Sequence, residues 1–110
     1  MGKGFRDWRR QPTTAATGRL LERLDRRWAL RVIWELRHGA LTFRGLQAAC
    51  GGVSPGVLQG RLHELRALGV IEKVPRLGYR LSVAGEQLGT ALEPLAEWAE
   101  RNSASLHAGE

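Results

Sequence analysis

Leucines recur at helical spacing in the middle of the chain, and this pattern predicts an amphipathic helix. Leu58, Leu62, Leu65 and Leu68 share one face, because residues three and four positions apart lie on the same side of a helix. Ser54 stands directly before a proline, an order typical of a helix start, since serine accepts a free backbone N–H and proline loses no hydrogen bond in the first turn. We expect a helix over residues 54–68. Its outer face is small, polar and mildly basic, and consists of Gly56, Gln59, Gly60, His63 and Arg66.

Residues 18–38 show a second helical pattern, which changes at Asp25; this residue either ends the first piece or caps the next. The apolar patch before it consists of Leu20, Leu21 and Leu24. From Trp28 to Leu36, apolar residues lie on nearly every side, which is typical of a helix buried on more than one face. In so small a domain, we expect the second burying surface to come from another subunit. A ligand pocket framed by Trp28 and Trp34 is the less favoured alternative.

A short helix and a glycine turn precede the central helix. Gly39 ends the second helical stretch, since glycine readily closes a helix C-terminus. Thr42 is a candidate N-cap for a helix over residues 43–50, and the few residues before it can form no more than an edge bridge. Gly51 and Gly52 then suit a tight connection. Helix, glycine turn and capped helix are the order of a helix-turn-helix.

Two short β-type runs follow, at residues 70–74 and 79–82, with a Pro- and Gly-containing turn between them. A helix-turn-helix followed by a basic hairpin predicts a winged helix-turn-helix, mainly α with a small β-hairpin wing. Ser82 is a candidate N-cap for a last helix over residues 83–102. Pro94 should kink or divide that helix, because proline removes a helical hydrogen bond.

The two ends of the chain lack helical periodicity. We expect residues 1–17 to form a flexible basic arm. The arm could follow DNA. The preferred alternative is that it is a disordered terminus, or that its Trp8 packs against a partner subunit. Residues 103–110 are expected to be frayed. Between them, residues 18–102 form one domain with dimerisation helices at both ends.

Charge is distributed unevenly along the chain. The net charge is +6, with +6 in residues 1–40, +4 in residues 41–82 and −4 in residues 83–110. A positive body suits a polyanion such as nucleic acid. An arginine-rich protein can also carry this net charge without binding any anionic partner. Charge alone therefore does not decide whether the protein binds DNA.

The sequence contains no enzyme signature. The three histidines are scattered, and the single cysteine, Cys50, cannot complete a zinc site. A small buried thiol is the ordinary interpretation of Cys50. The glycines punctuate helices and turns rather than form a phosphate-binding loop. We therefore expect no catalytic residue, no metal and no cofactor. No segment suggests a membrane span or a signal peptide, so a cytoplasmic location is expected.

Four segments, in order, resemble the HxlR-type winged helix-turn-helix transcriptional regulators. They are RWALRVIWEL (27–36), LTFRGLQ (41–47), VSPGVLQGRLHELRALGVIEK (53–73) and PRLGYRLSVAG (75–85). The resemblance covers about residues 18–102 and implies a bacterial homodimer that binds double-stranded DNA in the nucleoid. Its two recognition helices would enter successive major grooves, at half-sites about one helical turn apart. The sequence leaves room for a small-molecule effector but does not identify one.

Pattern and resemblance together nominate two sets of site residues. The DNA-binding set is Arg44, Ser54, Gln59, Arg61, His63, Lys73, Arg76 and Arg80. The dimer set is Leu20, Leu21, Leu24, Trp28, Leu92, Leu95 and Trp98. The amide of Gln59 offers the donor and acceptor that an adenine edge requires. Arg61 lies beside the apolar stripe and could instead form a salt bridge within the fold.

The chain departs from the family pattern at Gly56 and Gly60 and in its short wing. Glycine supplies no side-chain contact, and each one destabilises a helix interior by up to ~1 kcal/mol relative to alanine. These departures keep a second hypothesis open, in which the winged helix is a protein-interaction module or coats DNA without sequence preference.

Overall fold

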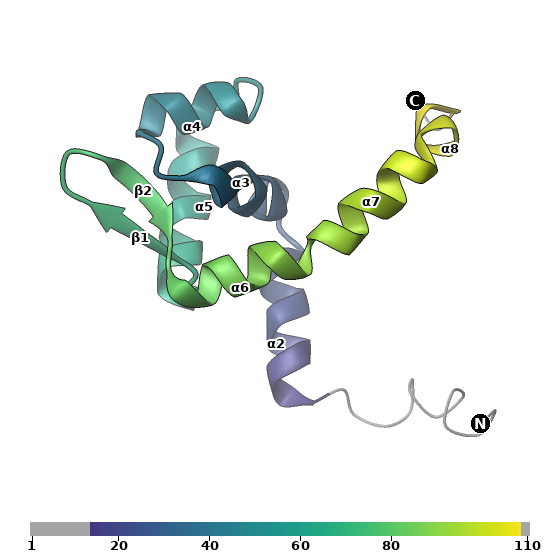
Figure 1. Cartoon of the computed structure of the whole chain (residues 1–110). Helices are drawn as coiled ribbons and strands as arrows, with labels where there is room; N and C mark the ends of the chain where they lie inside the picture. The colour runs from purple at the N-terminus through teal and green to yellow at the C-terminus, as the bar shows by residue number, and fades with distance from the viewer. Residues whose placement is uncertain (1–13, 109–110) are drawn as a thin grey trace.

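The chain folds into a small helical core with a projecting hairpin and outlying helices at both ends (Figure 1). The computed structural model describes residues 14–108. The elements in chain order are α2 (Ala15–Leu24), α3 (Ala29–Glu35), the 3₁₀ turn η1 (Leu36–His38), α4 (Phe43–Ala49), α5 (Pro55–Leu68), β1 (Ile71–Val74), β2 (Gly78–Leu81), α6 (Val83–Ala91), α7 (Glu93–Arg101) and α8 (Ser103–Ala108). The predicted fold class, mainly α with a small β-hairpin wing, is confirmed.

Local capping begins and ends the two helices of the helix-turn-helix. Thr42 Oγ1 accepts the backbone N–H of Gly45 at 3.0 Å, and Ser54 Oγ accepts that of Val57 at 3.3 Å. Gly69 closes α5 in the left-handed conformation, with φ of 86°. Because these signals lie within one turn of the helix ends, α4 and α5 agree with the predicted spans to within a residue.

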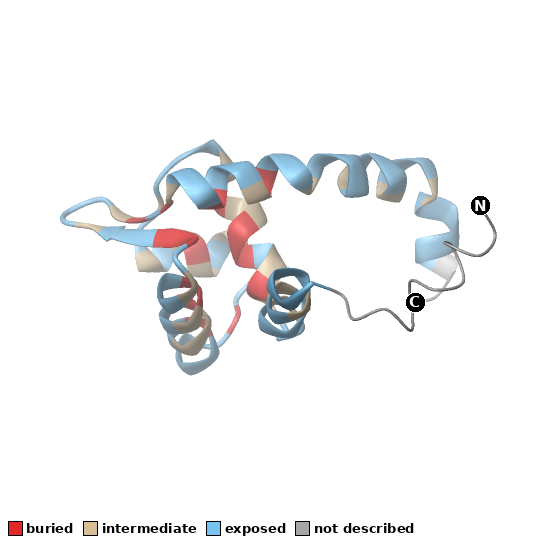
Figure 2. Cartoon of the chain, turned by 90° about the horizontal axis from the view of Figure 1, so that it is seen from below, coloured by how far each residue is buried: buried red, intermediate tan, exposed pale blue. Residues whose placement is uncertain are grey.

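The wing is an antiparallel hairpin of β1 and β2, in which Ile71 pairs with Leu81 and Lys73 with Tyr79. Leu41 exchanges two backbone hydrogen bonds with Tyr79, of 2.9 and 2.8 Å, and this is the predicted edge bridge. The wing extends away from the core on the side opposite α7 and α8 (Figures 1 and 2).

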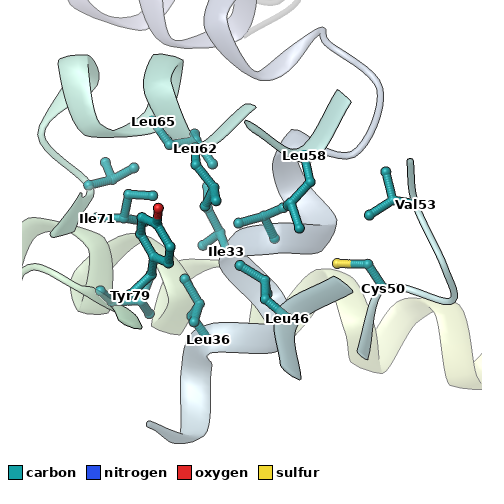
Figure 3. Close-up of a cluster of buried hydrophobic side chains, with 13 residues drawn as sticks. Ile33, Leu36, Leu46, Cys50, Val53, Leu58, Leu62, Leu65, Ile71 and Tyr79 are labelled. Carbon is teal, nitrogen blue, oxygen red and sulfur yellow. The ribbon is translucent and has the colours of Figure 1, made fainter. Parts of the chain in front are cut away.

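Buried apolar side chains from α3, α4, α5 and the wing meet in one core (Figure 3). Leu58, Leu62 and Leu65 are the contribution of α5. The other buried members are Val32, Ile33, Leu36, Leu46, Cys50, Val53, Val70, Ile71, Tyr79 and Leu81. Full burial of a leucine contributes about 1.5–3 kcal/mol, so this stripe fixes the orientation of α5 and leaves its opposite face in solvent.

The stretch from 18 to 38 is divided at Asp25, which ends the first helix and does not cap the next. Asp25 follows the last residue of α2, and α3 begins only after Trp28, whose φ of 79° is left-handed. A non-glycine residue in that conformation cannot continue a right-handed helix. The helix α2 also starts earlier than expected, at Ala15, because Thr14 caps it.

The C-terminal helix is divided near Pro94, as predicted: α6 ends at Ala91 and α7 begins at Glu93. The expected frayed end is wrong for residues 103–108, which form α8. Asn102 bridges α7 and α8, since its side-chain amide donates to the carbonyl oxygen of Trp98 at 2.9 Å. Residues 1–13 of the expected arm, together with 109–110, lie outside the described part of the chain.

Candidate nucleic-acid interface

The outer face of α5 is exposed and carries few side chains. Gln59 and His63 are exposed on it, between and beyond the two glycines. An ideal Cβ built on Gly56 or Gly60 meets no atom of residues 14–108 within 4 Å, outside its own helical surroundings. Packing therefore does not require either glycine, and the face is open to a partner.

Arg61, which the sequence analysis placed in the DNA-binding set, is turned into the fold. Its Nε donates to the backbone carbonyl oxygen of Arg27 at 2.7 Å, and its Nη1 lies 3.0 Å from Oε1 of Glu64. The side chain is only 14% exposed. We therefore replace the expected DNA contact of Arg61 with an intramolecular role. Arg26 adds a second link to Glu64, at 3.4 Å, so two contacts hold α5 to the junction between α2 and α3.

Ser82 joins the wing to the C-terminal end of α5. Its hydroxyl donates to the carbonyl oxygen of Gly69 at 2.7 Å, and its backbone N–H donates to that of Val70 at 3.0 Å. The same hydroxyl accepts the N–H of Gly85 at the start of α6. Gly85 has no room for a side chain, because a Cβ there would overlap the Val70 carbonyl oxygen. This join fixes the position of the wing relative to α5.

The wing carries three exposed cations in different surroundings. Arg80 pairs across the hairpin with Glu72, at 2.9 Å. Lys73 lies 6.0 Å from the centre of the Tyr79 ring. Arg76 is at the tip, with a left-handed φ of 70°. Among residues 14–108, neither Lys73 nor Arg76 has an ion-pair partner, and the same is true of Arg44 at the exposed start of α4.

Two exposed apolar residues on these elements were missed by the sequence analysis. Val57, in the first turn of α5, is 37% exposed, and Leu77, at the wing tip, is 55% exposed. The exposure of Val57 could have been predicted from its position in the sequence, because it directly precedes Leu58, the first leucine of the buried stripe. Helical spacing places it on the flank of the stripe rather than within it.

The predicted dimer residues fall into two groups. Leu24, Trp28 and Leu92 pack partly against the core. Leu21, Leu95 and Trp98 are 61%, 58% and 48% exposed, and Leu20 is half-buried. Neither α2 nor α7 contains a buried residue, as Figure 2 shows along α7.

Two open apolar grooves run beside these helices. One, of about 300 Å³, lies between α3 and α7, and the other, of about 550 Å³, lies against α2. Leu30 and Leu92 line both grooves, so the two are neighbours on one face of the protein. Leu30 is not in the predicted dimer set, but it belongs to the stretch for which a second subunit was expected as a burying surface.

Cys50 lies inside the core, beside Leu46 and Val53 (Figure 3). Burial raises the pKa of its thiol above the usual value; Arg31 opposes this shift and Glu35 adds to it. Burial therefore favours the neutral thiol of Cys50. Because the thiolate is the nucleophilic form, this burial disfavours reactivity. Across residues 14–108 no cluster of His, Cys, Asp and Glu side chains is arranged to hold a metal ion.

A capped helix with an open face, a preceding helix at a glycine turn and a cationic hairpin define a winged helix-turn-helix of the DNA-binding class. The family of HxlR-like helix-turn-helix proteins matches residues 23–106. The chain belongs to this family, whose members are DNA-binding transcriptional regulators rather than enzymes.

The chain is similar to several proteins of this kind. It is 30% identical to the uncharacterised HTH-type transcriptional regulator YtfH of Escherichia coli, over 76% of this chain and 71% of that protein. It is 32% identical to YvaP of Bacillus subtilis, over 69% of this chain and 76% of YvaP. The structure of ytfH from Salmonella typhimurium matches with a TM-score of 0.70 and 29% identity, over 84% of this chain and 88% of that one. Within residues 14–108 no helix has the length and apolar character needed to cross a membrane.

Proposed function

We propose that the chain acts as a homodimeric, sequence-specific DNA-binding regulator, with α5 in the major groove and the wing on the backbone or in the minor groove. The rigid pairing of an open α5 face with a cationic wing carries this proposal. Ser82 holds the two elements together, and Arg61 and Glu64 hold α5 to the rest of the fold. A helix can read bases only if its position relative to the phosphate contacts is fixed.

The exposed cations supply the phosphate contacts in this proposal. Lys73 and Arg76 lie on the wing and Arg44 at the start of α4, and none of them is neutralised by an acid among residues 14–108. Phosphate contacts provide most of the affinity and almost no sequence information. Arg80 contributes less, because Glu72 already pairs with it.

Base recognition falls to the polar side chains on α5. Gln59 is exposed and its amide matches an adenine edge in the major groove. His63 lies one turn further along the same face. Ser54 accepts the Val57 N–H as helix cap, and its hydroxyl proton remains available to a phosphate.

The apolar surfaces of α2 and α7 support the homodimer. Both helices are amphipathic, yet neither buries a residue within one chain. A second copy would cover Leu21, Leu95 and Trp98 and fill the neighbouring grooves. Two-fold symmetry would then present two copies of α5 to one face of the duplex.

The test begins with selection of a preferred duplex from a randomised library, followed by fluorescence anisotropy at several salt concentrations. A sequence-specific regulator should prefer its selected site over random duplexes by about a thousandfold or more. Equal binding to all duplexes with a steep salt dependence would instead show a DNA-coating role. Absence of binding at low salt would contradict DNA recognition and favour a protein partner.

Two single substitutions separate base recognition from backbone contact. Gln59→Ala should cost about 1–3 kcal/mol on the selected site and relax preference at one position. Arg76→Ala should weaken binding to all sequences alike and reduce the salt slope. An unchanged ranking of sites in Gln59→Ala would assign base recognition to other residues.

A further inference from the structure

The first turn of α5 presents one apolar side chain in bare surroundings. Val57 is 37% exposed, although the leucines that follow it are buried. Its neighbours on the surface of the helix are Gly56, immediately before it, and Gly60, three positions on. No other atom of residues 14–108 approaches within 4 Å of an ideal Cβ at either glycine. Val57 is therefore flanked on this surface by two residues without side chains.

The position of Val57 along the helix suits contact with bases. In a helix-turn-helix, the residues at the N-terminal end of the recognition helix contact base edges. Val57 is the third residue of α5, and Ser54 caps the turn that carries it by accepting the Val57 N–H. The flank of α5 that carries Val57 continues to Arg61 and Glu64, which are held by the α2–α3 junction. Val57 lies one turn before these contacts.

The chemistry of Val57 matches one feature of the major groove. Valine has no hydrogen-bonding group, and in a helix its branched side chain is largely restricted to one rotamer. The only apolar group that a base pair displays in the major groove is the C5-methyl of thymine. The absence of side chains at Gly56 and Gly60 allows α5 to approach the bases closely enough for methyl-to-methyl contact.

We propose that Val57 is a specificity-determining residue that selects thymine through contact with its C5-methyl group. This inference rests on the proposed function, because it requires α5 to lie in the major groove. It adds an apolar readout to the polar readout by Gln59. The preferred site should therefore contain, in each half-site, a thymine whose methyl group contributes to affinity.

The experiment uses the full chain and the duplex selected by the wild-type protein. Each thymine is replaced in turn by uracil, which removes the methyl group and preserves base pairing. Burial of one methyl group corresponds to about a fourfold change in affinity, so uracil in one half-site should weaken wild-type binding by about fourfold, and uracil in both half-sites by about sixteenfold. Val57→Ala changes both subunits, so it should bind the thymine duplex about sixteenfold more weakly and show no further loss with uracil. Gln59→Ala is the matched control on the same turn of α5 and should retain the full loss with uracil.

Two outcomes would overturn the inference while leaving the proposed function intact. One is a selected site at which no uracil substitution weakens binding. The other is an equal uracil penalty in the wild type and in Val57→Ala, which would assign the methyl contact to another residue. If selection yields no preferred duplex, the proposed function and this inference both fail. Val57→Ala should fold normally, because the site is exposed and alanine favours a helix, and circular dichroism checks this.

Discussion

Arg76, a proposed phosphate contact, has a backbone conformation that is unfavourable for an L-residue. It occupies the third position of a turn in which the Leu77 N–H donates to the Val74 carbonyl oxygen at 3.1 Å, and Pro75 precedes it. Turns with proline second and a positive φ at the third position usually have glycine there. If the wing contacts DNA as proposed, the strained position keeps a positive charge at the wing tip.

Arg76→Gly should therefore be more stable than Arg76→Ala. Both variants lose the guanidinium group, but only glycine relieves the left-handed backbone, which costs an L-residue about 1 kcal/mol or more. Urea denaturation should show a free energy of unfolding about 1 kcal/mol higher for Arg76→Gly than for Arg76→Ala. DNA affinity should fall equally in the two variants. Equal stabilities would mean that the turn relaxes without glycine.

Single residues were the least predictable part of the candidate site. Spacing alone placed Gln59 and His63 on the outer face of α5, since both follow from the leucine stripe. Spacing could not predict whether the Arg61 side chain points into solvent or bonds within the fold, because its acceptor, the carbonyl oxygen of Arg27, is distant in sequence. The close approach of the Val70 carbonyl oxygen to Gly85 is equally non-local, since Val70 lies between α5 and β1, whereas Gly85 belongs to α6.

Two side-chain contacts connect α5 to the junction between α2 and α3. Arg61 reaches from α5 to the carbonyl oxygen of Arg27, at the strained junction where Trp28 has a left-handed φ. The junction in turn leads directly into α2. Any displacement of α2 therefore has a direct path to the recognition helix.

Arg61→Ala should destabilise the protein. It removes a largely buried hydrogen bond from a charged group and leaves the Arg27 carbonyl oxygen without that partner, a loss of about 1.5–3 kcal/mol. Arg66→Ala is the control, because Arg66 lies on the same helix, is exposed and has no side-chain partner among residues 14–108. Its effect should stay within about 0.5 kcal/mol. Similar losses in both variants, measured by urea denaturation, would refute an anchoring role.

The boundaries of elements were predictable wherever a local signal sets them. Thr42, Ser54, Gly69 and Pro94 each act within one turn, and the helices they bound were predicted from the sequence. The break before α3 was harder to place, because the conformation of Trp28 depends on packing against the core. The helix α8 was missed, since its short sequence lacks an apolar stripe.

At the scale of the whole molecule, the chain is extended for its size. The structure measures 53 × 35 × 23 Å, with a radius of gyration of 16.1 Å, whereas a compact domain of about 100 residues has a radius near 13 Å. The difference reflects α2, α7 and α8, which project from the core (Figure 1). Exposed apolar side chains on such projecting helices, here Leu21, Leu95 and Trp98, are typical of an interaction surface.

Introducing charge into α7 should separate the proposed dimer. Leu95→Glu combined with Trp98→Glu places two carboxylates on the apolar face, where burial of an unpaired charge is strongly unfavourable. Light scattering should then give a mass near 12.2 kDa, that of one chain, and DNA affinity should fall because each monomer contacts only one half-site. Glu97→Ala, on the exposed polar side of α7, should leave the dimer intact. A wild-type mass of one chain would contradict the homodimer.

The glycines of α5 also bear on protein engineering. Side chains could be added at positions 56 and 60 without meeting any other part of residues 14–108 outside their own helical turns, and Val57, Gln59 and His63 near them are exposed. Substitutions on the outer face of this helix should therefore change the proposed DNA preference without disturbing the packing of the fold. A library randomised at positions 56, 57, 59, 60 and 63 should yield variants that keep the scaffold and address new operators, which makes this small domain a starting point for programmable regulators.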